Sequence, residues 1–112
     1  MAETSYPEKT CEIDRLVTQE ALVQATLEGR KTQQRRNGVY AYPDEEFELN
    51  GITFEVTRVF RQTLGDITDE DAAKEGYEDL DTYRESILGI HGGMTWDAQQ
   101  KVWVHEFRRK AS

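Results

Sequence analysis

The sequence predicts an α+β domain, a small mixed or closed β-barrel flanked by short helices. Asn50-Gly51 lies between two alternating segments, which is the strongest short-range signal for a β-hairpin. Residues 101–108 alternate and are apolar on both faces near their centre, which is typical of an interior strand. The remaining helical segments are too short for parallel crossover units, so these patterns disfavour a doubly wound sheet.

The first predicted element is an amphipathic helix over residues 12–28. Its apolar residues recur at spacings of three and four: Ile13, Leu16, Val17, Ala21, Leu22 and Ala25. Gly29 follows at the position where a C-terminal cap belongs, because glycine adopts the left-handed conformation that ends many helices.

The hairpin comes next, with strands over residues 47–49 and 52–56. The residues expected to face the core are Phe47, Leu49, Ile52, Phe54 and Val56. Val59 and Phe60 cannot both continue that face, so we expect a bulge or a strand end near Thr57–Arg58.

Two short helices and a closing strand complete the chain. Thr68 is the expected N-cap of the first helix, and Gly76 ends it. The second helix, residues 80–88, is expected to turn four side chains inward: Leu80, Tyr83, Ile87 and Leu88. The break at residues 91–93 precedes the closing strand, where Trp103, His105 and Phe107 share one face. We assign Trp96 and Trp103 to the core and His91 to a loop.

Length and composition indicate one compact domain, with residues 1–10 a flexible lead-in and residues 11–110 the folded part. No apolar run approaches the ~20 residues of a membrane helix. A single cysteine, Cys11, excludes an internal disulfide and fits a reducing compartment. We therefore expect a cytoplasmic monomer with no membrane partner, no metal site and no cofactor.

The charge distribution is uneven. The chain has 22 Asp+Glu against 14 Lys+Arg, for a net charge of −8, which fits either an acidic protein that avoids nucleic acid or a surface adapted to high salt. Residues 29–43 nevertheless contain no carboxylate, and four cations lie within residues 30–36. A cationic segment in an acidic chain indicates an anion site, with phosphate the natural candidate.

The order and spacing of several short segments resemble the ASCH domain family, which has a PUA-like β-barrel fold. The match covers roughly residues 16–108. Its segments are Gly29-x-Lys31 with Arg36, Phe54-Glu55-Val56, Gly65-Asp66-Ile67-Thr68, Glu75-Gly76, Tyr83-Arg84, Trp96 and Val104-His105-Glu106-Phe107. The resemblance implies recognition of RNA or of a modified nucleoside in a cleft beside the barrel.

Some similar proteins are small metal-independent hydrolases of acetylcytidine or RNA. The pattern of the acetylcytidine amidohydrolase has a Lys base, a Thr nucleophile three residues later and, before a Gly, a Glu as a supporting acid or orienting group. Lys31 and Glu75 match the first and third positions, whereas Gln34 stands at the Thr position and leaves Thr32 as the hydroxyl of that segment. The resemblance thus implies Lys31, Thr32 and Glu75 as catalytic residues of an alternative, enzymatic function.

The binding residues that we predict line a cationic cleft: Arg30, Lys31, Gln34, Arg35, Arg36, Tyr40 and Tyr42. Lys31 is open to three roles, as a phosphate ligand, a solvated cation or a base. Arg35 and Arg36 have two alternatives: both bind a phosphate, or one of them pairs with Glu75 inside the fold. The tyrosines either stack on a base or pack in the barrel. A third function, a protein-interaction adaptor using the acidic second helix, rests on charge alone.

Overall fold

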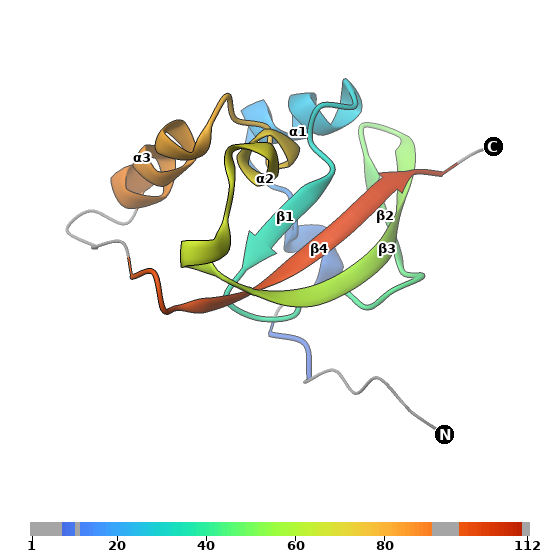
Figure 1. Cartoon of the computed structure of the whole chain (residues 1–112). Coiled ribbons are helices and arrows are strands. Elements are labelled where there is room, and N and C mark those ends of the chain that lie inside the picture. Colours follow the sequence, from blue (N-terminus) through green and yellow to red (C-terminus); the bar gives the residue numbers. More distant parts are fainter. Residues whose placement is uncertain (1–7, 11, 91–96, 111–112) are drawn as a thin grey trace.

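The computed structural model describes residues 8–10, 12–90 and 97–110. It contains a curled four-stranded sheet with the order β1-β4-β3-β2, and Figure 1 shows the three α-helices gathered along one side of it. The elements are η1 (Ile13–Arg15), α1 (Glu20–Leu27), β1 (Gln33–Arg36), β2 (Glu46–Leu49), β3 (Ile52–Thr63), η2 (Leu64–Asp66), α2 (Asp69–Lys74), α3 (Leu80–Ile90) and β4 (Lys101–Arg109). The predicted α+β class is confirmed, and the strand pairings described are all antiparallel.

The hairpin prediction is confirmed. Asn50 and Gly51 both have positive φ, 50° and 84°, as a two-residue turn of this kind requires. The register pairs Phe47 with Phe54 across β2 and β3, and their rings stack at 5.6 Å. A register shift between Val56 and Arg58 confirms the predicted bulge, and β3 continues beyond it to Thr63.

β4 lies inside the sheet, between β1 and β3, as its two apolar faces predicted. Successive side chains of a strand point to opposite faces. His105 and Phe107 therefore face the main core with the partly buried Trp103, while Val102 and Val104 face the other side.

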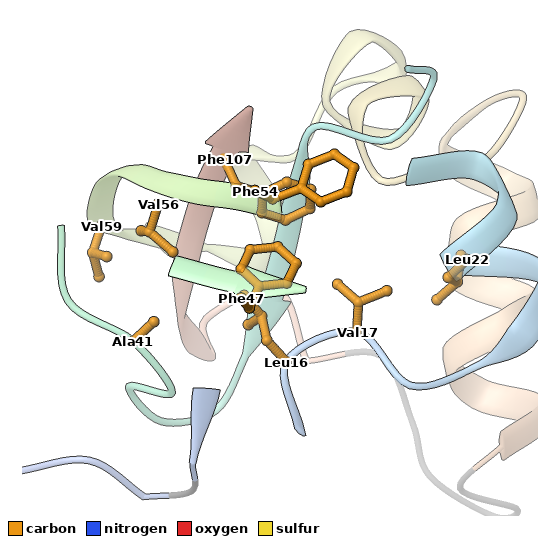
Figure 2. Close-up of a cluster of buried hydrophobic side chains, with 9 residues drawn as sticks. All are labelled: Leu16, Val17, Leu22, Ala41, Phe47, Phe54, Val56, Val59 and Phe107. Carbon is orange, nitrogen blue, oxygen red and sulfur yellow. The ribbon is translucent and has the colours of Figure 1, made fainter. Parts of the chain in front are cut away.

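Buried side chains form two clusters, and Figure 2 shows the larger one, in which two phenylalanines of the hairpin meet Phe107 of β4. Its members are Leu16, Val17, Leu22, Ala41, Phe47, Phe54, Val56, Val59 and Phe107. The smaller cluster joins α2 and α3 to the sheet through Leu64, Ile67, Ala72, Tyr83 and Val102. Trp96 and His91, and the side chain of Leu88, lie outside the described residues.

The prediction of a single helix over residues 12–28 is wrong. The chain instead forms η1, an extended segment at Gln19 and then α1, so Leu16 and Val17 enter the main core while Ala21 remains exposed. The guanidinium of Arg36 donates to the backbone carbonyls of Leu16 and Arg15, at 2.7 and 3.3 Å. In a continuous helix these carbonyls would accept from residues 20 and 19, so Arg36 satisfies the acceptors that the break exposes.

α2 begins where the sequence predicted. The hydroxyl of Thr68 accepts from the backbone N–H of Asp71, and the Asp71 carboxylate accepts from the N–H of Thr68, a reciprocal capping box. Gly76 follows with a φ of 100°, and it packs against Ala25 and Lys31.

No helix in the described part of the chain is long and apolar enough to span a membrane.

Replacing Thr68 with alanine removes the acceptor of this capping box. We expect the free energy of unfolding to fall by about 1 kcal/mol, the usual loss for an N-cap of this type. Urea denaturation followed by circular dichroism measures it, with Lys74→Ala, an exposed position of the same helix, as a control expected to change stability by less than about 0.5 kcal/mol. Equal losses in the two variants would contradict a capping role.

Candidate functional site

A pocket of about 310 Å³ lies between β1, the start of α1 and the helices α2 and α3. β1 is an edge strand, so one of its sides is not covered by another strand. The lining residues are Thr18, Gln19, Leu22, Gln34, Arg35, Arg36, Asn37, Tyr40, Leu64, Glu75, Tyr77, Tyr83, Ser86, Ile87, Gln100 and Val102. The break in the predicted first helix is what brings Thr18 and Gln19 to this wall.

Behind the pocket, a buried network of charges joins β1 to the end of α2. Glu75, 1% exposed, lies between two cations: its Oε1 is 3.2 Å from Lys31 Nζ and its Oε2 is 2.9 Å from Arg35 Nη1. Arg35 also donates to Gln62 at 2.8 Å and lies 3.6 Å from the Asp71 carboxylate. Two cations and two carboxylates therefore neutralise one another here, and little positive charge remains to attract an anion.

Lys31 has the surroundings of a structural ammonium. Its Nζ donates to the backbone oxygens of Gln33 at 2.7 Å and Glu75 at 3.0 Å, and to the Glu75 carboxylate. These three acceptors use all three of its protons. Burial lowers the pKa of Lys31, while the neighbouring Glu75 carboxylate raises it in part.

His105 links two pocket segments from within the main core. Its Nδ1 lies 3.1 Å from the carbonyl oxygen of Gln34, and its Nε2 accepts from the backbone N–H of Tyr40 at 3.0 Å. This arrangement requires a neutral ring with its proton on Nδ1. Burial lowers the pKa of His105 to about 4, which keeps the ring neutral.

Arg36 is the cation that remains at the pocket. Its guanidinium carbon lies 5.1 Å from the centre of the Tyr40 ring, and among the described residues it forms no ion pair with a carboxylate. Two of its contacts are the backbone carbonyls near η1. Arg36 thus keeps an uncompensated positive charge in a fixed position.

Three neighbouring side chains of β1 leave hydrogen-bonding capacity unused at this wall. Gln34 Oε1, Arg35 Nη2 and Arg36 Nε are each buried and have no hydrogen-bond partner among the described residues, although Arg35 Nη2 lies 3.6 Å from the Asp71 carboxylate. Gln33 Oε1 is a fourth such atom of β1, but Gln33 does not line the pocket. Buried polar atoms are satisfied in the great majority of cases. All three side chains line the pocket, which makes it the place where a ligand could supply the missing partners.

The predicted binding residues are only partly brought together. Gln34, Arg35, Arg36 and Tyr40 line the pocket, whereas three others lie elsewhere. Arg30 is exposed and pairs with Glu28 at 2.7 Å. Lys31 lies in the buried network, and Tyr42 lies beside Lys9, whose Nζ is 5.2 Å from its ring centre.

The residues named for the hydrolase separate in the same way. Glu75 lines the pocket, but Lys31 and Thr32 do not. Thr32 is held through its backbone, since its N–H donates to Lys74 at 2.7 Å and its carbonyl accepts from Phe107 at 3.0 Å. Among the residues described, no three His, Cys, Asp or Glu side chains are grouped to hold a metal ion.

Sequence reasoning did not identify the helical wall of the pocket. Tyr77, Tyr83 and Ser86 line it, with the Tyr77 and Tyr83 rings edge-to-face at 5.3 Å and the Tyr77 hydroxyl 3.0 Å from Ser86 Oγ. Burial raises the pKa of the Tyr83 phenol, so this wall stays uncharged. The sequence predicts that Tyr83 faces the core, and Tyr83 is indeed buried. Nothing in its spacing indicates that it also borders a cavity.

Solved structures with this fold include the ASCH domain from Lactobacillus crispatus JV V101. It matches with a TM-score of 0.64 at 14% identity, covering 79% of this chain and 69% of that one. A protein from Enterococcus faecalis V583 with the family-model name DUF984 matches with a TM-score of 0.54 at 14% identity, covering 80% and 66%. No known family model and no curated protein matches the sequence. The chain therefore has the fold of an ASCH domain, as its sequence resemblance implied.

Proposed function

We propose that this domain binds a nucleoside, free or as an unpaired residue of RNA, in the pocket beside β1. The observation that carries the proposal is the unused hydrogen-bonding capacity of Gln34, Arg35 and Arg36 at the wall of a ligand-sized pocket. Small-molecule sites usually enclose roughly 300–1,000 Å³, and this pocket of about 310 Å³ fits a compact ligand.

The mixture of lining groups suits a heteroaromatic base. Tyr40 and Tyr77 contribute aromatic rings, and Leu22 and Ile87 contribute apolar surface. Unpaired bases are commonly recognised by stacking on such rings, a contact worth about 1–3 kcal/mol. Gln34 offers an amide, which both donates and accepts, so a small rotation lets it bond a base edge.

The charges around the pocket support different roles for its cations, unlike a cleft in which every cation binds the ligand. Lys31 and Arg35 are neutralised by Glu75 and are needed to hold β1 against α2. Arg36 is free to attract a phosphate, because its charge is not compensated by a described carboxylate. Phosphate attraction would then come from one positioned arginine, and base recognition from the pocket.

Replacing Gln34 with alanine is expected to weaken binding of single-stranded RNA or of a ribonucleoside by roughly tenfold, the usual effect of losing one or two hydrogen bonds to a ligand. Gln33→Ala is the matched control. Gln33 is the neighbouring buried amide on β1, but it donates to Glu106 at 2.9 Å and does not line the pocket. Calorimetric titration with the four ribonucleosides and a mixed RNA oligonucleotide measures both variants. Equal affinities in the two variants would remove the proposal.

The alternative, a metal-independent hydrolase, is favoured by one observation, the 3.2 Å contact between Lys31 and a pocket-lining Glu75. A general base needs a free lone pair, however, and the three acceptors around Lys31 suit its protonated form. Incubation with acetylcytidine and with single-stranded RNA separates the two functions. Turnover that disappears in a folded Lys31→Met variant would favour hydrolysis, and no turnover in the wild type favours binding.

A further inference from the structure

A row of three side chains crosses the sheet next to the pocket. Arg36 on β1 and Arg61 on β3 are both directly opposite Trp103 on β4. Residues directly opposite one another in an antiparallel pair lie on the same face, so all three share one face of the sheet. Figure 1 shows the ends of β1 and β3 beside the start of β4, where this row lies.

Arg61 is exposed but held in place. Its guanidinium carbon lies 5.0 Å from the centre of the Trp103 ring, and Trp103 is itself partly buried against the main core. A guanidinium stacked on an aromatic ring loses less side-chain freedom when its N–H groups then bind a phosphate. Among the described residues, Arg61 forms no ion pair with a carboxylate, so its charge stays available.

The row continues into the pocket at its other end. Arg36 lines the pocket and lies over the Tyr40 ring, whereas Arg61 and Trp103 lie outside the lining. β1 and β3 are two strand spacings apart, roughly 10 Å, so one compact ligand in the pocket does not span the row. An extended polyanion that starts in the pocket is long enough to span the row.

We infer that the row Arg36–Trp103–Arg61 binds the backbone of a single-stranded RNA whose neighbouring nucleotide occupies the pocket. The inference rests on the proposed function and adds that the ligand is a strand. Its main support is charge complementarity: although the chain has a net charge of −8, two arginines that lie over aromatic rings and lack described carboxylate partners flank Trp103 on one face of the sheet. Arg61 contacts a phosphate outside the pocket, and Arg36 contacts the one at its mouth.

Arg58 provides a matched control on the same strand. Its guanidinium also lies over an aromatic ring, 4.3 Å from the centre of Phe60, and its side chain is 62% exposed. It differs in two respects: Arg58 pairs with Glu106 at 3.5 Å, and it is three residues from Arg61 without an intervening bulge, hence on the opposite face.

The experiment measures binding of a fluorescent, mixed-sequence single-stranded RNA of about eight nucleotides, a typical length for such sites, over a series of KCl concentrations. We expect Arg61→Ala to weaken binding several-fold at low salt and to reduce the slope of log K against log salt by about 0.7, the value for one phosphate contact in a single strand. Affinity for a ribonucleoside should not change. Arg58→Ala should leave both affinities and the slope at their wild-type values.

The outcomes separate the two proposals. An RNA affinity that depends on Gln34 but not on Arg61, or that falls equally in Arg58→Ala and Arg61→Ala, overturns the inference and leaves the pocket proposal in place. A dependence on Arg61 without one on Gln34 overturns the pocket proposal, and with it the claim that the strand starts there. No binding of either the oligonucleotide or the ribonucleosides overturns both.

Discussion

Replacing Glu75 with alanine is expected to lower the free energy of unfolding by about 3–5 kcal/mol, because removal of one partner leaves buried charges uncompensated. Both Lys31 and Arg35 lose their closest carboxylate, and the side chains of all three residues are at most 1% exposed. Chemical denaturation at pH 7 measures the change. Glu75→Gln, which keeps the shape and part of the hydrogen bonding, is expected to lose less.

Two variants control for this result. Glu78→Ala removes an exposed carboxylate a few residues away and should change stability by less than about 0.5 kcal/mol. Lys31→Met removes one cation but leaves the 2.9 Å pair between Arg35 and Glu75, so its loss should be smaller than that of Glu75→Ala. A Glu75→Ala variant as stable as Glu78→Ala would show that the network does not hold β1 against α2.

The second large effect is a loss of stability at acidic pH, which we attribute to His105. The pKa of His105 is about 4 in the folded chain, because burial disfavours the charged ring, against 6.5 for an ordinary histidine. As the pH falls below 6.5, the unfolded chain takes up a proton that the folded chain does not. Stability is therefore lost progressively between pH 6.5 and 4, by on the order of 3 kcal/mol in total.

Urea denaturation at a series of pH values measures this loss, with His105→Gln as the comparison. Glutamine does not titrate, so the variant should lose little stability between pH 6.5 and 4.5, although it is less stable at pH 7. Burial raises the pKa values of Glu45 and Asp71, but their polar contacts together lower them, those of Glu45 with Lys9 and Tyr42 and those of Asp71 with Thr68, Gln62 and Arg35. Their ordinary values of 4.5 and 3.8 place the resulting losses of stability at lower pH. Parallel curves for the two proteins between pH 6.5 and 4.5 would contradict the assignment.

Signals that depend on adjacent residues predicted local structure well. The Asn50-Gly51 turn, the Thr68 cap and the interior strand over residues 101–108 are all present. Each is recognisable because a turn, a cap or a two-sided apolar strand depends on the conformation and burial of a few consecutive residues.

For the cationic segment, by contrast, the order of residues did not predict which side chains share a surface. Its four cations were expected in one cleft, but Arg30 lies on the surface, Lys31 and Arg35 pair with Glu75, and Arg36 lines the pocket. The sequence did allow an arginine paired with Glu75, and Arg35 is that residue. Alternation along a strand separates neighbours onto two faces, so closeness in sequence did not mean a shared surface.

The fold class, the hairpin and the acidic chain with one carboxylate-free segment were determined by the sequence itself. The pocket was decided by tertiary structure, because its walls depend on contacts between distant residues. Arg36 bonds the carbonyl of Leu16, 20 positions earlier, at the break in the first helix, and Lys31 meets Glu75, 44 positions later. Burying charged and polar groups requires partners, and only the folded chain determines which distant residues become those partners.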